Sequence, residues 1–238
     1  MLTFAIGDIH GCYRELLLLW QGIEEYAAEH GQPFMVVTLG DYVDRGPASS
    51  QVIQFLIEKK KVMGDNLICL KGNHEDMFLA RQSWGGFWKS EGGDETMASY
   101  RKNGKVHIPK EHVDFIKSLR LYYSNGRQLF VHAAIHPHKT LAEQTEDVLL
   151  WDRSWLKYRG RYAIREFVVH GHTSVWDFDE RAFRVNIDTS CVFGGKLTAA
   201  VFDDREDDNR PVVYLQVESG YDYNYNFFSK YDMEERAI

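Results

Sequence analysis

Cysteine is scarce in this chain, and the few cysteines lie far apart. The sequence holds three of them, Cys12, Cys69 and Cys191, and no two form a Cys-x-x-Cys pair. An odd number at such wide spacing provides no disulfide framework and is typical of reduced thiols. We therefore expect a cytoplasmic protein.

Long apolar runs are also missing. Near the start, the longest strongly apolar run covers residues 16–20, which is far too short to span a bilayer. No basic segment precedes the first apolar stretch, and Asp8 interrupts that stretch. The sequence therefore predicts neither a secretory signal peptide nor a membrane as partner.

Positive charge is in deficit, because 28 Lys and Arg face 35 Asp and Glu, a net charge of −7. Such a protein is a poor candidate for binding nucleic acid through its phosphates. The chain also lacks a Gly-x-Ser-x-Gly elbow, a Walker loop and a Gly-x-Gly-x-x-Gly motif. Serine-hydrolase, NTPase and dinucleotide-cofactor chemistry therefore have no support.

What the chain does contain is ordinary globular material. Apolar residues make up 44% of the 238 positions, charged residues 26% and aromatic residues 14%. This composition excludes disorder and coiled coil, and the length is enough for a large core. No linker divides the sequence, so we predict one domain over residues 1–238, with residues 221–238 as a C-terminal extension.

The first half alternates short apolar runs with helical patterns. Residues 3–6, 34–39 and 67–70 are apolar and predict strands. Each run ends in glycine beside Asp or Asn and is followed by apolar residues at helical spacing, as in residues 16–27. Strand, polar loop and helix repeated three times predict parallel strands with right-handed crossovers.

The second half has a different pattern. Residues 82–104 are rich in Trp and Gly and predict a loop with a short helix at residues 96–100. Residues 121–123 and 128–131 flank Ser-Asn-Gly-Arg, a strong hairpin signal. Further strands are predicted at residues 167–169, 183–187, 197–202 and 212–217. We expect an α/β fold in which two mixed β-sheets pack as a sandwich, with helices outside.

Polar side chains follow the predicted strands where each strand ends. In open α/β sheets, ligands bind beyond the carboxyl ends of the strands. The side chains at these ends are carboxylates, an amide and imidazoles, with glycines beside them that allow sharp turns. The candidate metal ligands are Asp8, His10, Asp41, Asn73, His132 and His172.

These residue types favour Mn, Fe or Zn over a thiolate-bound metal. Asp8 and His10 are two positions apart, so an extended backbone would point both to one side. Six candidates exceed the needs of one ion, which predicts two divalent metal ions sharing Asp41, the carboxylate between the other blocks. Two metals clamp the attacking and leaving oxygens of an in-line displacement, typically at phosphorus, where a bridging hydroxide is the nucleophile.

The remaining polar residues of these blocks then acquire catalytic roles. Arg45 and Arg153 can hold phosphoryl oxygens in fork geometry. His74 lies next to a predicted ligand but is not needed for coordination, so it is a candidate general acid. Asp44 can orient the His74 ring.

The ordered blocks GDIHG, GDYVDRG and GNHE resemble the PPP-type metallophosphatases, the family of Ser/Thr phosphoprotein phosphatases, in their small bacterial and phage form. Later blocks around His132, Arg153 and His172 follow in the order expected of that family. The resemblance implies a calcineurin-like metallophosphoesterase fold with a dinuclear metal site. It also implies that the six candidate ligands bind the metals, that His74 and Asp44 form the acid pair, and that Arg45 and Arg153 bind phosphate.

Two substrates stay open at this point. Asp44 and Glu75 are both present, which favours phosphomonoester hydrolysis on a phosphoprotein or phosphopeptide. The alternative is symmetrical hydrolysis of a dinucleoside tetraphosphate, because the family also contains such enzymes. A third hypothesis, a non-catalytic binding module, predicts the loss of a ligand or of the acid, and none is lost.

Two aromatic segments have a structural and a functional interpretation. Trp84, Phe87 and Trp88 could line the floor of a substrate groove, although packing beneath a long loop is the simpler prediction. Residues 221–228 could cover a sheet edge or contact a partner, and we favour the first.

Overall fold

Two five-stranded sheets form the centre of the molecule, for which the computed structural model describes residues 1–158 and 162–221. In spatial order, the first sheet contains β12 (Val213–Glu218), β11 (Lys196–Asp203), β1 (Leu2–Ile6), β2 (Phe34–Thr38) and β3 (Leu67–Cys69). The second contains β6 (Tyr122–Ser124), β7 (Gln128–Val131), β8 (Phe167–His170), β10 (Arg184–Asn186) and β9 (Asp179–Glu180). Both sheets mix parallel and antiparallel pairs, so the prediction of two mixed sheets is confirmed.

The first sheet is built by the strand–helix repeats of the first half. Helices α1 (Tyr13–His30) and α2 (Ser49–Met63) connect β1, β2 and β3, which pair in parallel as predicted. Side chains alternate across β1, so that Leu2, Phe4 and Ile6 join the core beneath the two helices. Ala5 faces the other way, into the core between the sheets.

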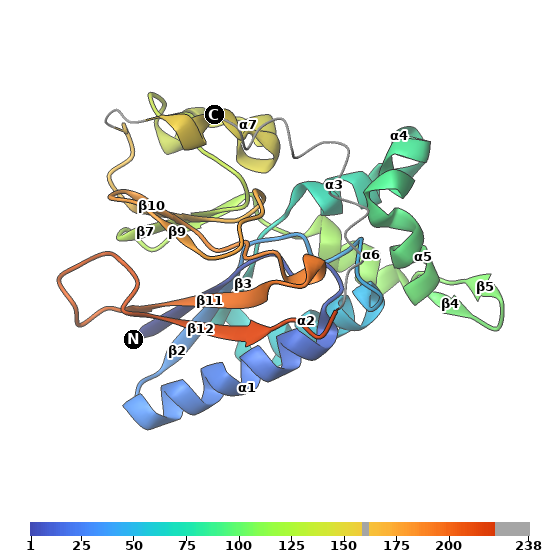
Figure 1. The fold of residues 1–238 in the computed structure, drawn as a ribbon, viewed down its shortest axis with the longest axis horizontal. Helices are drawn as coiled ribbons and strands as arrows, with labels where there is room; N and C mark the ends of the chain where they lie inside the picture. Colours follow the sequence, from blue (N-terminus) through green and yellow to red (C-terminus); the bar gives the residue numbers. More distant parts are fainter. Residues whose placement is uncertain (159–161, 222–238) are drawn as a thin grey trace.

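The second sheet closes the sandwich. Its hairpin of β6 and β7 pairs antiparallel at the predicted Asn-Gly turn. Phe130 and Val169 of this sheet pack against Val37 and Phe202 of the first one. The outer face of the second sheet is covered by α7 (Glu146–Trp151), as Figure 1 shows at the top of the molecule. The helices therefore lie outside the two sheets, as expected.

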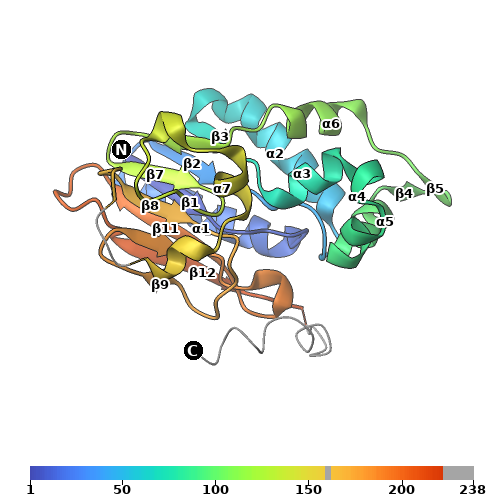
Figure 2. The ribbon, with the colours of Figure 1, turned by 90° about the horizontal axis from the view of Figure 1, so that it is seen from above.

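The segment after β3 is more helical than the sequence predicted. Helix α3 (Asn73–Leu79) is followed by α4 (Arg81–Trp88), a π-helical turn at Lys89–Gly93 and α5 (Asp94–Ser99). The prediction of a loop here was wrong, because Gly85 and Gly92 act as kinks with φ of 50° and 97° and the helical path continues on either side. Figure 2 shows α4 and α5 on one side of the sandwich.

Smaller elements complete the described fold. The two-stranded ribbon of β4 (Arg101–Lys102) and β5 (Lys105–Val106) projects beyond α5 (Figure 1), and α6 (Lys110–Lys117) follows it. None of the described helices is both long and apolar enough to cross a membrane. The predicted C-terminal extension falls outside the described residues except for Tyr221, which packs against the core beneath α1 and α2.

Candidate metal centre and active site

The loops that follow β1, β2, β3, β7 and β8 converge and bring all six predicted metal ligands into one buried region. None of the six is more than 7% exposed. Several site residues hold a left-handed backbone that L-residues rarely adopt, which is common at functional sites. They are His10, Asp41, Asp44, Arg45 and His172, with φ between 44° and 70°.

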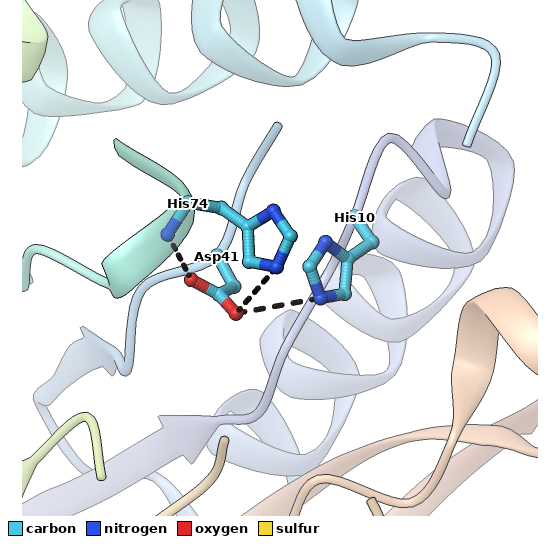
Figure 3. A group of neighbouring side chains, drawn as sticks. All are labelled: His10, Asp41 and His74. Carbon is cyan, nitrogen blue, oxygen red and sulfur yellow. Dashed lines mark hydrogen bonds and ion pairs between the residues drawn. The ribbon is translucent and has the colours of Figure 1, made fainter. Parts of the chain in front are cut away.

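Asp41 lies at the centre of this region. Its Oδ2 is 3.4 Å from His10 Nε2 and 3.9 Å from His74 Nε2, and these three side chains face one another in Figure 3. Its Oδ1 is 3.4 Å from His132 Nε2. Two groups of donor atoms that could hold a metal ion therefore share this carboxylate: His10, Asp41 and His74, and Asp41, His132 and His172.

Backbone carbonyls orient two of the imidazole rings. His10 Nδ1 lies 2.8 Å from the carbonyl oxygen of Val43, and His132 Nδ1 lies 3.0 Å from that of Leu39. A carbonyl accepts only from N–H, so each Nδ1 carries the proton and each Nε2 lone pair points toward Asp41. This is the tautomer that a metal-ligating histidine needs.

Asn73 and His172 complete the second group. Asn73 Oδ1 is 2.9 Å from His132 Nε2 and 3.0 Å from His172 Nδ1, so three donor atoms meet at one point. Burial lowers the pKa of His132 and His172, which keeps both rings neutral. Neutral imidazole is the form that binds a cation.

Asp8 is placed by the loop after β8 rather than by His10. The backbone N–H of His172 donates to its carboxylate at 3.1 Å, and an added Cβ on Gly171 would lie 2.0 Å from Asp8 Oδ1. Asp8 and His10 both lie beside Asp41, as expected, but the backbone between them is not extended throughout, because His10 has a φ of 44° and the chain turns there.

The charge balance of the site fits bound cations. Burial raises the pKa of Asp8 well above its usual value, and the nearby carboxylates of Asp188 and Asp41 raise it further. Burial raises the pKa of Asp41 as well. The interactions with His132, His74 and His10 outweigh burial, however, and hold this pKa well below its usual range. Buried carboxylates beside neutral imidazoles are stable when cations compensate their charge. The residues present thus fit divalent metal ions.

Two arginines border the donor groups. Arg45 Nη1 lies 2.8 Å from His10 Nε2, its Nη2 donates to Glu91 at 3.3 Å, and its buried Nε has no hydrogen-bond partner among the described residues. Arg153 is exposed, and its Nε lies 3.2 Å from His172 Nε2. Both guanidinium groups therefore lie where an anionic ligand of the centre would meet them.

His74 is held by a buried network built on Asp44. His74 Nδ1 donates to Asp44 Oδ2 at 2.8 Å, and Trp88 Nε1 donates to the same oxygen at 2.9 Å. Thr96 Oγ1 donates to Asp44 Oδ1 at 2.7 Å. Burial raises the pKa of Asp44 to about 7, although the bonds from Thr96 and Trp88 lower it. The network fixes the His74 ring with Nε2 toward Asp41.

We expect Asp44→Asn to lower kcat by about 10- to 100-fold, as losses of such supporting hydrogen bonds do. The amide keeps the shape of the side chain but cannot accept from His74, Trp88 and Thr96 with a full negative charge. Steady-state kinetics checks this, and a double variant with His74→Asn should be no slower than His74→Asn alone. Multiplicative losses in the double variant would show that Asp44 acts independently of His74.

Glu75 assembles the loop after β2. Its carboxylate accepts from the backbone N–H groups of Asp41, Tyr42 and Gly72 at 2.8, 2.8 and 2.9 Å. Because Asp41 has a left-handed φ of 52°, these bonds stabilise the backbone conformation that aims its side chain. Glu75 thus positions Asp41 and has no direct contact with the reacting region.

Sequence reasoning missed Thr96 and the role of Trp88. Thr96 lies at the start of the short helix predicted at residues 96–100, a segment that was given no role in the site. Asp188, whose carboxylate raises the pKa of Asp8, accepts from the N–H of Ser190 at 3.2 Å and from Ser174 Oγ at 2.9 Å. His170 is buried against Trp155 in the core.

Comparison with known proteins agrees with this geometry. Residues 1–197 match the model of the calcineurin-like phosphoesterase family. The chain belongs to this family. It is 31% identical over 237 residues to "Bis(5'-nucleosyl)-tetraphosphatase PrpE [asymmetrical]" of Anoxybacillus flavithermus, covering 87% of this chain and 92% of the relative. This calcineurin-like phosphoesterase is therefore a hydrolase, and the resemblance to metallophosphatases is confirmed at the family level.

Two further similarities are more distant. "Bis(5'-nucleosyl)-tetraphosphatase, symmetrical" of Nitrosomonas europaea is 28% identical over 168 residues, covering 68% of this chain and 58% of the relative. A crystal structure of a cold-active protein-tyrosine phosphatase from Shewanella sp. superposes with a TM-score of 0.64 at 18% identity, over 91% of this chain and 80% of that one. The second similarity shows the shared fold alone.

Proposed function

We propose that this phosphoesterase hydrolyses dinucleoside tetraphosphates and cuts their phosphate bridge asymmetrically. The observation that supports this most is the Anoxybacillus relative, whose name states that activity and whose similarity extends over 87% of the chain. Unequal cleavage of a bridge of four phosphates yields a nucleoside triphosphate and a nucleoside monophosphate. Equal cleavage, the alternative raised from the sequence, yields two nucleoside diphosphates.

A phosphoprotein substrate, the first prediction from the sequence, rested on the presence of Asp44 and Glu75. In the structure, Asp44 orients His74, and Glu75 holds the backbone that carries Asp41. Neither role depends on which phosphoester is cleaved, so these residues do not discriminate between substrates. Ser/Thr phosphatase activity stays a prediction, and the named relatives favour the dinucleotide.

In the proposed reaction, each part of the site has a distinct role. Asp8, His10, Asp41, Asn73, His132 and His172 would hold two divalent metal ions, with Asp41 shared. When bound, such ions polarise a phosphoryl group and lower the pKa of water. Oxygen and imidazole donors without thiolate suit Mn, Fe or Zn, and we take Mn²⁺ as the first ion to test.

The other residues bind the substrate and move a proton. Arg45 and Arg153 bind the phosphoryl oxygens. Burial lowers the pKa of His74 well below its usual value, whereas the carboxylate of Asp41 raises it. A bound polyphosphate adds negative charge beside the ring and favours its protonated form. His74 Nε2 then donates that proton to the leaving phosphate oxygen.

Product analysis tests the proposed function. We expect chelator-stripped protein to be inactive and Mn²⁺ to restore hydrolysis of diadenosine tetraphosphate to ATP and AMP, resolved by anion exchange. A phosphoserine peptide in a parallel reaction should turn over more slowly. ADP as the sole nucleotide product would establish symmetrical cleavage, and a preference for the phosphopeptide would establish a protein phosphatase.

A further inference from the structure

An aromatic strip lies beside the metal centre, on side chains to which the chemistry above gives no role. It consists of Trp84 and Phe87 of α4 and Trp151 at the end of α7. The ring centroids of Trp84 and Trp151 are 5.7 Å apart with an interplanar angle of 26°, and those of Trp84 and Phe87 are 5.5 Å apart. Trp84 is 37% exposed and Phe87 is 50% exposed, so the strip faces solvent.

The elements that carry this strip also contact the active site on two sides. The carbonyl oxygen of Trp151 lies 3.3 Å from His172 Nε2, and Arg153 follows two residues later. Trp88, four residues after Trp84 in α4, donates to Asp44. The strip therefore extends between the phosphate-binding side and the acid side of the centre.

The elements that carry the strip are firmly anchored. Lys71 Nζ forms ion pairs with Asp76 of α3 at 2.7 Å and with Glu146 of α7 at 2.8 Å. Trp88 is 4% exposed and packs edge-on against Phe78 of α3. In Figure 2, α3 lies between α7 and α4. The rings are thus presented by a fixed framework.

The three aromatic residues Trp84, Phe87 and Trp88 have two different environments. Trp88 is buried and packs, which agrees with the simpler prediction from the sequence. Trp84 and Phe87 are not covered by a loop in the described residues, contrary to that prediction. Between them, Gly85 has a φ of 50° and kinks the helix, so Trp84 and Phe87 do not follow one regular helical period.

We infer that this strip is a stacking platform for one nucleobase of the substrate. A nucleotide polyphosphate combines an anionic chain, which suits Arg45 and Arg153, with a flat base that stacks on aromatic rings. The inference deepens the proposed function and rests on it for the identity of the substrate. Trp84 and Phe87 are binding residues that contribute to affinity and take no part in the chemical step.

The platform can be tested separately from the proposed function by measuring how nucleotides inhibit the hydrolysis of a simple aryl phosphate. With Mn²⁺-loaded protein and p-nitrophenyl phosphate as substrate, the inhibition constants of ATP and of inorganic tripolyphosphate are compared. Both inhibitors carry three phosphates, but only ATP carries a base. We expect ATP to bind about tenfold more tightly, since stacking one base on an aromatic ring contributes affinity of this order.

Trp84→Ala should abolish the advantage of ATP and leave inhibition by tripolyphosphate and kcat unchanged within about twofold. Trp84→Phe, which keeps a ring, should retain most of it. Phe183→Ala is the matched control, because Phe183 is also an exposed aromatic residue, with 54% of its surface accessible. It precedes β10, whereas the site residues lie beyond the other end of that strand. For diadenosine tetraphosphate, Trp84→Ala should raise KM about tenfold without changing kcat.

Two results would overturn the platform. One is an unchanged advantage of ATP in Trp84→Ala. The other is equal weakening of both inhibitors, which would mean that the substitution disturbs the phosphate site. Failure of the wild-type protein to hydrolyse diadenosine tetraphosphate, with the ATP advantage present and lost in Trp84→Ala, would reject the proposed function and keep a base-binding platform.

Discussion

Asp41→Asn is expected to reduce kcat by about 10³-fold and to lower the metal content of the protein. Asp41 is the carboxylate that the two donor groups share, so its charge acts on both cation positions. Metal-ion stabilisation of a phosphoryl transition state is worth several kcal/mol, and each 1.36 kcal/mol corresponds to a factor of ten in rate. Loss of this charge therefore affects both binding and catalysis.

The substitution is well suited to this test because we expect it to leave the fold intact. Asp41 Oδ1 accepts from the backbone N–H of His74 at 3.1 Å, and an asparagine oxygen at the same place can keep that bond. We expect unchanged circular dichroism.

Metal analysis after desalting gives a readout independent of turnover. The wild-type protein should retain close to two Mn²⁺ per chain, and Asp41→Asn should retain fewer. Asp65→Asn is the matched control, since Asp65 is an exposed aspartate ahead of β3 and away from the converging loops. Full metal content together with full activity in Asp41→Asn would contradict the shared carboxylate.

His74→Asn is expected to lower kcat by about 100-fold with diadenosine tetraphosphate and to leave KM nearly unchanged. General acids contribute roughly 10²- to 10⁴-fold, and a leaving phosphate is only moderately basic, so the lower end applies. His74 Nε2 lies 3.9 Å from Asp41 Oδ2, and its ring packs edge-on against His10 with centroids 4.6 Å apart. His74 Nε2 is therefore farther from Asp41 than the Nε2 atoms of His10 and His132, which are 3.4 Å away, as a proton donor beside the metal ligands would be.

Comparing substrates with different leaving groups shows whether His74 is a proton donor or a metal ligand. p-Nitrophenolate leaves readily without a proton, so we expect His74→Asn to lose less than about tenfold with p-nitrophenyl phosphate. A metal ligand would affect both substrates equally and would reduce bound Mn²⁺. His107→Asn serves as control, because His107 is exposed after β5. Equal losses with both substrates would assign His74 to metal binding.

The ends of the first three strands show how far sequence reasoning reached. Glycine beside Asp or Asn after an apolar run predicted where Asp41 and Asn73 lie, because parallel strands end on the same edge of a sheet. The donor chemistry also predicted cations, and the structure places the six candidate ligands in one region. Their assignment as ligands stays a prediction that the metal analysis tests.

The same reasoning failed where backbone conformation departs from a regular period. His10 turns with a positive φ, so its relation to Asp8 follows no strand alternation. Gly85 and Gly92 read as helix breakers, yet each only kinks a path that continues as helix. A glycine allows a left-handed residue in a loop or within a helical path, and local sequence does not distinguish the two.

The sequence by itself determined the chemistry of this protein: which donor types are present, in what order they follow the strands, and that they suit phosphoester hydrolysis with metals. Tertiary structure alone decided that Trp88 and Thr96 hold Asp44 and that Trp84 stacks on Trp151. Donor type is a property of each residue, whereas these contacts join residues 44 to 67 positions apart, from Trp88 and Asp44 to Trp151 and Trp84. Only packing of the whole chain brings such segments together.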